Sequence, residues 1–542
     1  MIDAVNRGIG RFEPLGGRAR FLVSDRLIPE QKHAVEFVLE SRDRAVSISG
    51  AAGTGKTAAL RELNRGLSEA GRGVLAVAPA MSAVEELKKV GFSDAVTVER
   101  LLQDQSMHAT MQGKVLILDE AGMVSGRQMC ELLRIAEQQS SRIVFSGDTK
   151  QIRSVEAGDA LRVLEKESRL KSVSLTQVHR QAVQGYREAI QEFRRDPARG
   201  LERLEAMGAV REVPWSERAQ AVAQALAEYR AQGRNPLVVC ATHDEIGRVT
   251  EAIRSSMKQA GELREGTQVW RDVSVNWTTA RKRDLGNLRP GQILGFHRAV
   301  KGIARSESVE VVTARSNCAM VRNRLGEVKR ITAKQAGSFE VYERRPIEVS
   351  AGDRLLLTAN RREPGFRATN GEIVTVRSVD QQGQIRLLDG RTLRDNYKQF
   401  AYGYAVTAHR SQGKSVDSVV ISGDGMSREL FYVAASRGRE CVLVITGDKE
   451  LLHRSVARST ARQSASELAR KRRPGLHRGI QRGLAAARRL AAWAAKHLRP
   501  GRRSTPRKEL MHELRPAPSQ EPRQPIHSEL VKEQSHDHSI SR

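Results

Sequence analysis

The sequence has few aromatic residues and no long apolar run. Aromatic side chains make up only 4% of its 542 residues, so stacking of ligand rings on aromatic side chains is not its dominant mode of recognition. No stretch of about 18 apolar residues occurs, which excludes a membrane-spanning helix. The N-terminal segment, MIDAVNRGIGRFEP, lacks the apolar core of a signal peptide.

Cysteine is scarce and scattered. The four cysteines form no CxxC pair and no Cys/His spacing typical of a zinc site. We therefore expect no disulfide framework, which is consistent with the reducing cytoplasm. The HDH motif at His536 to His538 lies in a Pro-, Ser- and Gln-rich tail, and we interpret it as part of a disordered segment rather than a metal site. The cysteines are Cys130, Cys240, Cys318 and Cys441.

Acidic residues are outnumbered, with 63 Asp and Glu against 91 Lys and Arg, for a net charge of +28. Half of this excess lies in the last 89 residues, which hold 21 Lys and Arg against 7 Asp and Glu. Such a balance favours a polyanionic partner, either nucleic acid or an anionic membrane surface. The alternative is a basic tail that only keeps the protein soluble.

After a lead-in over residues 1–26, short apolar runs alternate with helical patterns. Continuous apolar runs are expected for parallel strands that are covered on both faces, and helical patterns lie between them at residues 58–70 and 82–90. This alternation predicts a doubly wound α/β domain over residues 27–177. The predicted strands are Ala45 to Ile48, Val74 to Ala78, Val115 to Leu118 and Ile143 to Phe145.

A second α/β unit is predicted in two parts, over residues 178–272 and 393–450. Its strands at 237–241, 419–422 and 442–445 and its helix at 245–260 follow the same rules. Between the two parts, residues 273–392 change to short β runs separated by Gly and Asp, which predicts an inserted β domain. The basic tail, residues 451–542, is predicted to hold an amphipathic helix at 476–498 and then disorder.

A phosphate-binding loop follows the first predicted strand. The segment GAAGTGKT matches GxxxxGK[ST] and opens a helix, which is the context that this motif requires. Backbone N–H groups and the helix N-terminus would face the phosphates, with Lys56 on the β- and γ-phosphates and Thr57 on Mg²⁺. The predicted nucleotide-binding residues of the loop are Gly50, Ala51, Ala52, Gly53, Thr54, Gly55, Lys56 and Thr57.

Polar residues also follow the third and fourth predicted strands. Asp119 and Glu120 come after the strand at 115–118, where a Mg²⁺ ligand and a water-activating base are expected, in that order. Gly147, Asp148 and Gln151 form GDTKQ after the strand at 143–145. The neutral amide of Gln151 suits a sensor of the γ-phosphate. These residues predict hydrolysis of the bound nucleotide.

The ordered motifs resemble superfamily 1 helicases of the RecD-like group. Within that group, the chain is similar to the helicase half of MobF-type conjugative relaxases, the TraI and TrwC kind. The segments that carry the resemblance are GAAGTGKT, LAVAPAMSAVEEL, LDEAG, GDTKQIRSVEAGDAL, LTQVHRQ, YGYAVTAHRSQGKSVD and FYVAASRGRE. The resemblance spans about residues 27–448. It implies two tandem RecA-like P-loop NTPase domains with a small β-barrel-like insertion in the second, ATP and Mg²⁺ as cofactors, and 5′→3′ movement on single-stranded DNA.

The resemblance also implies roles for single residues. Gln31 matches the glutamine that reads adenine, and Arg180 and Arg437 match two arginines that reach the γ-phosphate from the second domain. Lys56, Glu120, Gln151, Arg180 and Arg437 thus form the expected catalytic set. The segment from Thr407 to Gly413, including Gln412, matches the motif that couples the nucleotide state to DNA. The expected DNA contacts are Pro79, Thr97, Thr407, His409, Arg410 and Ser411.

The chain departs from the family pattern in three places. Ala80 and Met81 stand where relatives often have Thr and a polar residue, so the DNA contacts of that segment are open. Arg410 stands where Lys is common, which keeps the charge. Only about 26 residues precede the helicase body, so no relaxase module is seen and we expect no DNA nicking by this chain alone. The start of the sequence resembles the lead-in to the helicase half of longer relaxases, which leaves truncation open.

The leading hypothesis is an ATP-dependent DNA helicase of conjugative transfer, with a relaxase or coupling protein as a further partner. A RecD-like repair helicase and a non-catalytic DNA-binding accessory subunit are the alternatives. RNA is less favoured than DNA as the nucleic acid along which the protein would move. The basic tail has four interpretations: DNA binding, docking of a partner, a solvated extension, or a helix lying on an anionic membrane.

Overall fold

Six parallel strands form the first sheet of the protein. The computed structural model describes residues 1–18, 21–149, 159–363, 365–394 and 396–460. The strand order is β3-β2-β4-β5-β1-β6, and all four strands predicted for this region are confirmed. The strands are β1 (Ala45–Gly50), β2 (Val74–Ala78), β3 (Val96–Thr97), β4 (Val115–Leu118), β5 (Arg142–Gly147) and β6 (Lys171–Leu175).

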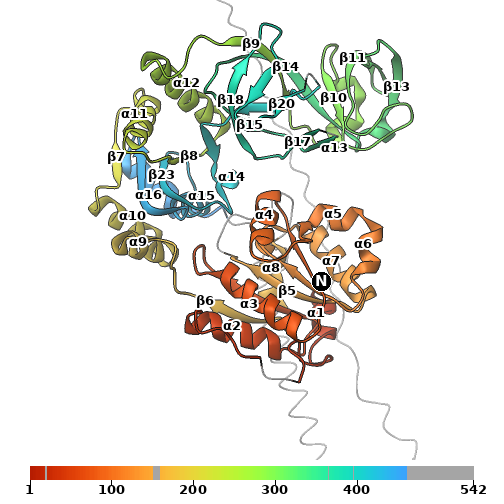
Figure 1. Ribbon diagram of the computed structural model, residues 1–542, viewed down its shortest axis with the longest axis vertical. Helices are drawn as coiled ribbons and strands as arrows, with labels where there is room; N and C mark the ends of the chain where they lie inside the picture. Colours follow the sequence, from red (N-terminus) through yellow and green to blue (C-terminus); the bar gives the residue numbers. More distant parts are fainter. Residues whose placement is uncertain (19–20, 150–158, 364, 395, 461–542) are drawn as a thin grey trace, which may run out of the picture. The chain divides into compact units, whose positions relative to one another are not determined.

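Helices cover both faces of this sheet, as expected for apolar strands without alternation. One apolar core joins the sheet to α2 (Pro29–Glu40), α3 (Lys56–Glu69) and α4 (Met81–Lys89). A second core on the other face takes in Val5 of the N-terminal lead-in. That core includes α1 (Ile2–Arg7), α5 (Val98–Gln103), α6 (Gln105–Thr110), η1 (Ala121–Met123), α7 (Gly126–Gln138) and α8 (Ala160–Glu167). Figure 1 draws these elements in red to orange.

Five parallel strands form the second α/β unit, in the order β22-β8-β23-β24-β7. They are β7 (Val210–Glu212), β8 (Leu237–Cys240), β22 (Ala405–Thr407), β23 (Val416–Ser422) and β24 (Gly438–Thr446). One face packs on α9 (Gln184–Arg195), α10 (Pro197–Ala206), α15 (Arg428–Ala435) and α16 (Lys449–Ala457). The other packs on α11 (Arg218–Ala231) and α12 (His243–Gln259). A short helix, α14 (Ala408–Ser411), follows β22. The split α/β unit predicted from the sequence is therefore present.

The insertion contains two antiparallel sheets and two apolar cores, one within the first sheet and one that joins β9 and β14 of that sheet to the second. The first is β9 (Thr267–Ser274), β10 (Ile293–Phe296), β11 (Ser308–Arg315), β12 (Cys318–Arg322), β13 (Val328–Thr332) and β14 (Phe339–Val349), with short helices α13 (Thr279–Arg283), η2 (Leu285–Asn287) and η3 (Ala333–Gln335). The second is β15 (Arg354–Leu357), β18 (Ile373–Val379), β19 (Ile385–Leu387), β20 (Thr392–Leu393) and β21 (Phe400–Tyr402). A ribbon of β16 (Arg361–Glu363) and β17 (Phe366–Ala368) lies between β15 and β18 in the sequence.

The strands of the insertion run from Thr267 to Tyr402, which is wider than the predicted range of 273–392. The reason is pairing at both ends. β9 pairs with β14 along its whole length, and β21 pairs with β15. Both flanking segments therefore belong to the β sheets rather than to the α/β unit.

A buried ion-pair cluster attaches the insertion to α12. The Arg254 guanidinium donates two hydrogen bonds of 2.9 Å to the carboxylate of Asp353. Its third nitrogen lies 3.3 Å from Glu348, which also accepts from Lys258 at 2.8 Å. The hydrogen bond from Lys258 is the main cause that lowers the pKa of Glu348 to about 2. Tyr404 donates to Asp353 as well, at 2.7 Å. The cluster anchors the insertion through charges that are satisfied only when all partners are present.

Replacing Arg254 by leucine is expected to destabilise the protein by about 3–5 kcal/mol, because it leaves the fully buried Asp353 without its partner. Urea unfolding measures the change. Arg248→Leu is the matched control: its side chain is 66% exposed and pairs with Glu245, so its loss should cost less than about 1 kcal/mol. Equal destabilisation by the two variants would contradict the anchoring role.

All four cysteines are free. No helix among the described residues is long and apolar enough to cross a membrane, and these residues contain no cluster of three or more metal-binding His, Cys, Asp or Glu side chains. The predicted tail helix at 476–498, the disorder after it and the HDH motif fall within residues 461–542, which lie outside the described residues.

Candidate functional site

The loop after β1 is folded around glycines that no other residue can replace without strain. Gly53 and Gly55 have φ angles of +82° and +80°, in the left-handed region. A Cβ at Gly53 would lie 2.4 Å from the Cβ of Arg180, and one at Gly55 would lie 2.1 Å from Nε2 of Gln31. The loop therefore packs closely against the two residues that sequence reasoning placed on the nucleotide.

Lys56 and Thr57 stand at the first turn of the 14-residue helix α3. The Lys56 ammonium donates to the carbonyls of Gly50 and Ala51, at 2.7 and 3.2 Å, and so lies folded back over the loop. Thr57, the next residue, is exposed. Free backbone N–H groups of the first turn, the helix dipole and the ammonium together make a site for a phosphate chain.

Gln31 is held against this loop. Its amide donates to the carbonyl of Thr54 at 3.2 Å and accepts from the Ile28 N–H at 3.4 Å, and it is only 7% exposed. The neighbouring Glu30 accepts from the backbone N–H groups of Thr176 and Gln177, at 2.8 and 3.1 Å. Glu30 thus ties α2 to the segment that leads to Arg180. No sequence pattern pointed to Glu30.

Asp119 and Glu120 follow β4 at the same carboxyl edge of the sheet. The Ser146 hydroxyl donates to Asp119 at 2.7 Å. Burial, and next the negative charge of Glu120, raise the pKa of Asp119 above its usual 3.8, while Lys56 opposes the shift. Glu120 has a φ of +50°, in the left-handed region that non-glycine residues rarely adopt. Such local backbone strain is typical of functional sites.

The acidic pair and Thr57 fit a divalent cation. Asp119 is half-buried next to a second carboxylate, so its ionised form lacks sufficient positive charge nearby, as its raised pKa reflects. A hard cation with oxygen ligands would supply that charge. Thr57 and Asp119 are the residues that would hold it.

Two arginines from the second unit lie close together and feel the charge of Glu120. The Arg180 guanidinium donates to the carbonyl of Ser436 at 3.0 Å. Arg437, only 1% exposed, donates to the Val433 carbonyl at 2.8 Å and to the Ser436 hydroxyl at 3.0 Å. Burial, and then repulsion by Arg180, lower the pKa of Arg437 to about 9, with Glu120 opposing the shift. Burial also lowers the pKa of Arg180. An anion between the arginines would relieve this repulsion.

The third motif is described only in part. Gly147 ends β5, where a Cβ would approach the Ala121 N–H to 3.2 Å, and Asp148 lies 3.4 Å from Arg194 of α9. Gln151, the predicted γ-phosphate sensor, is outside the described residues. Its role stays a prediction.

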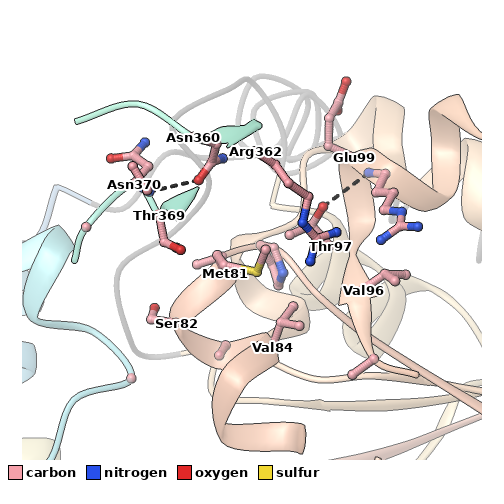
Figure 2. A pocket seen from close by; sticks show the side chains of 18 of the residues that line it. Met81, Ser82, Val84, Val96, Thr97, Glu99, Asn360, Arg362, Thr369 and Asn370 are labelled. Atoms are coloured by element: carbon pink, nitrogen blue, oxygen red, sulfur yellow. Dashed lines mark hydrogen bonds between the residues drawn. The ribbon is translucent and has the colours of Figure 1, made fainter. Parts of the chain in front are cut away.

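A groove of about 1460 Å³ runs beside this site. One wall comes from the start of α4 and the β3–α5 junction. The other comes from the β16–β17 ribbon, the Thr369–Gly371 turn, and residues 409–410 and 412–414. Figure 2 shows Arg362, Thr369 and Asn370 of the insertion facing Met81, Ser82 and Thr97. Glu120 also lines the groove, so groove and acidic pair are continuous.

The predicted DNA contacts divide into two groups. Pro79, Thr97, His409 and Arg410 line the groove. Thr407 and Ser411 do not line it. Thr407 accepts from the Arg410 N–H and caps α14, whereas Ser411 is fully buried and donates to the Ala408 carbonyl at 2.7 Å. The short helix turns the Ser411 side chain inward, and the role of Ser411 in DNA binding stays a prediction.

Comparisons with known proteins agree with the motifs. Residues 26–214 match an AAA domain model. The multifunctional conjugation protein TraI of Escherichia coli is 26% identical over 514 residues, which is 81% of this chain. The conjugal transfer protein TraA of Rhizobium radiobacter is also 26% identical, over 83% of the chain. The chain resembles the superfamily 1 helicases.

Two further relatives bear the word helicase in their names. The ATP-dependent DNA helicase dda of phage T4 is 30% identical over 25% of this chain and 34% of its own length. The solved structure of Pif1 helicase from Bacteroides is 16% identical, with a TM-score of 0.40, over 84% of this chain and 97% of that one. The chain spans only 28% of the length of TraI and 35% of that of TraA. It is therefore similar to one part of those longer proteins.

Proposed function

We propose that this protein hydrolyses ATP to move along single-stranded DNA. The observation that carries the proposal is the meeting of two sets of residues. Lys56, Asp119 and Glu120 follow strands of the first sheet, whereas Arg180 and Arg437 lie beyond it in the chain and respond to the charge of Glu120. A site that needs both units for its charges suits hydrolysis coupled to domain movement.

In this proposal each side chain has one task. Lys56 and the loop N–H groups hold the phosphates, and Gln31 recognises the base. Glu120 accepts a proton from the attacking water. Arg180 and Arg437 stabilise the negative charge that develops on the transferred phosphoryl group. Mg²⁺, held by Thr57 and Asp119, would neutralise phosphate charge.

The groove supports the proposal that the protein moves along DNA. Gln412, which follows α14, lies 3.5 Å from the Glu120 carboxylate, while His409 and Arg410 of α14 line the groove. One short segment therefore touches both the acidic pair and the groove. A change at the nucleotide can reach DNA through it, which a motor requires. Phosphate contacts by basic side chains are expected to dominate the binding.

The relatives favour a role in conjugative transfer, since TraI and TraA are named as conjugation proteins. We extend to this chain the 5′→3′ direction of the resembled family, and a relaxase or coupling protein as a partner. A RecD-like repair helicase with the same residues is the second candidate. The gene neighbourhood distinguishes them, because transfer genes favour the first.

The test is ATP hydrolysis by the purified protein with and without oligothymidylate, with Lys56→Ala as the blank for contaminating ATPase. We expect strong stimulation by single-stranded DNA. Unwinding of forks with either a 5′ or a 3′ tail then gives the direction. Hydrolysis that does not respond to single-stranded DNA would overturn the motor.

The raised pKa of Asp119 predicts a pH dependence. Protonated Asp119 cannot serve a cation, so kcat/KM for Mg-ATP is expected to fall about tenfold per pH unit below that pKa, at a pH above the usual 3.8. The stability of the nucleotide-free protein changes with pH in the opposite direction to kcat/KM. A carboxyl whose pKa is raised by folding destabilises the nucleotide-free protein as the pH rises from about 3.8 through the raised value. Steady-state kinetics and thermal unfolding over pH check both. A flat kcat/KM would contradict the assignment.

A further inference from the structure

Arg437 lies in the two-residue turn 436–437 between α15 and β24. Ser436 contacts both arginines of the site: its carbonyl accepts from Arg180 at 3.0 Å, and its hydroxyl accepts from Arg437, also at 3.0 Å. The turn is tightly packed, since a Cβ at Gly438 would lie 2.7 Å from the hydroxyl oxygen of Tyr186. The directions of both guanidiniums therefore depend on where the backbone of this turn is held.

Gln181 follows Arg180 directly in the chain and holds this turn. Its Nε2 donates to the Gly438 carbonyl at 2.9 Å and to the Ser436 carbonyl at 3.4 Å. These two carbonyls belong to the residues on either side of Arg437. One side chain therefore fixes the backbone on both sides of one arginine. A peptide bond joins the same residue to the other arginine, although 256 residues separate Arg180 from Ser436.

Packing alone does not explain a glutamine at this position. The Gln181 side chain is fully buried, with 0% exposure. Its Oε1 finds no hydrogen-bond donor among the residues that the structure describes. A buried acceptor without a donor costs free energy, which an unbranched apolar side chain such as methionine would avoid. The donor nitrogen, which holds the turn, is the part of the side chain that accounts for the amide.

The two arginines need such a hold because they carry like charges. Repulsion by Arg180 is the second cause, after burial, that lowers the pKa of Arg437. Until an anion binds between them, this repulsion favours movement of the guanidiniums away from each other. The hydrogen bonds from Gln181 to the turn oppose that movement. Because the amide is neutral, it adds no negative charge that would compete with a phosphate for the arginines.

We propose that Gln181 is a positioning residue that keeps Arg180 and Arg437 aligned on the phosphoryl group transferred from ATP. The inference rests on the proposed function, because it takes both arginines as parts of the site of ATP hydrolysis. Gln181 acts only through the backbone of the turn and touches neither nucleotide nor DNA. A displacement of about 1 Å in a reacting geometry can cost about 10²-fold in rate, so a residue of this kind has a measurable effect. Gln181 was assigned no role from the sequence.

Replacing Gln181 by methionine keeps the length of the side chain and removes both polar atoms. We expect the turnover number for ATP to fall about 10²-fold. The Kd of a fluorescent ATP analogue should change less than about threefold, because the first unit holds the nucleotide. Gln399→Met is the matched control. Gln399 is 4% exposed and its Oε1 is likewise without a donor in the described part of the chain, but it lies just before β21 of the insertion, so its replacement should change neither quantity.

A second measurement distinguishes positioning from a general loss of stability. ADP with aluminium fluoride imitates the phosphoryl group during transfer, whereas ADP alone does not. In the wild type, aluminium fluoride should strengthen the binding of a fluorescent ADP, because both arginines reach the added group. In Gln181→Met this strengthening should be about tenfold smaller, with the Kd of ADP alone nearly unchanged. A merely structural glutamine would lower the unfolding temperature and leave the ratio of the two Kd values as in the wild type, and that result would overturn the proposal.

Failure of this inference is distinct from failure of the motor. If Arg437→Ala slows turnover while Gln181→Met keeps the wild-type turnover and the wild-type response to aluminium fluoride, the positioning role is wrong and the site of hydrolysis stands. If the wild type hydrolyses ATP without a response to oligothymidylate, the motor is wrong. The two Kd values are measured without DNA, so in that case they still decide the role of Gln181 in hydrolysis. If the wild type neither hydrolyses ATP nor responds to aluminium fluoride, both proposals are wrong.

Discussion

Replacing Arg437 by alanine is expected to lower the turnover number for ATP about 10³- to 10⁵-fold, the range for removal of an arginine that reaches the transferred phosphoryl group. Arg437 is held in place before any anion arrives, by hydrogen bonds to Val433 and Ser436. It therefore needs no reorganisation during the reaction, which is the basis of electrostatic catalysis. The DNA-stimulated rate at saturating ATP is the quantity to measure.

Measurement of nucleotide binding distinguishes a loss of turnover in Arg437→Ala from simple loss of the nucleotide site. Arg437 belongs to the second unit, whereas the loop at 50–57 and Gln31 hold the nucleotide in the first. The Kd of a fluorescent ATP analogue should therefore change less than about tenfold. Arg437→Lys keeps a charge but loses the planar fork, so its rate should stay well below that of the wild type. A variant that bound nucleotide normally and kept its turnover would contradict the assignment.

Because Arg437 is buried, its alanine variant needs a check on folding. Arg180→Ala provides it. Among the described residues, the Arg180 guanidinium donates one hydrogen bond, to the Ser436 carbonyl, and it feels the same charge of Glu120 as Arg437 does. Its loss should slow turnover in the same way, with a smaller effect on the unfolding temperature. Normal turnover in both folded variants would show that the arginines of the second unit take no part in ATP hydrolysis.

The motif residues of the first sheet could be predicted from the sequence because each follows an apolar strand directly. The loop at 50–57 begins at the last residue of β1, Asp119 directly follows β4 and Gly147 ends β5. Parallel strands bring such positions to one edge of the sheet. Strand position is a local property of the chain. The resemblance then added Gln31, Arg180 and Arg437, whose roles no periodicity indicates.

Features that depend on tertiary contacts were missed. Glu30 acts through Thr176 and Gln177, and Asn370 meets Arg410 only because the β17–β18 turn folds over α14. Neither contact leaves a pattern in the sequence. For Ser411 the motif predicted a contact with DNA, whereas the turn of α14 buries its side chain. The predicted range of the insertion, 273–392, was too short for a similar reason. Strand pairing at its two ends depends on partners far along the chain.

Glu120→Gln is the second large expected effect, a loss of about 10³-fold in turnover if its carboxylate accepts the proton of the attacking water. Glutamine has nearly the same size and meets the same backbone requirement at φ +50°, so the fold and the strain should persist. DNA affinity and nucleotide affinity should stay near the wild-type values, which makes hydrolysis the quantity that changes.

The same substitution should also move a second quantity that a purely structural role would leave alone. The charge of Glu120 is the second cause, after burial, of the raised pKa of Asp119. Its removal lowers that pKa, so binding of the Mg²⁺–nucleotide complex should persist to lower pH than in the wild type. Fluorescence titrations with a nucleotide analogue over pH measure this shift. If turnover of the variant were slow but the pH dependence of nucleotide binding were unshifted, the charge of Glu120 would have no effect on Asp119. Turnover within tenfold of the wild type would exclude Glu120 as the base.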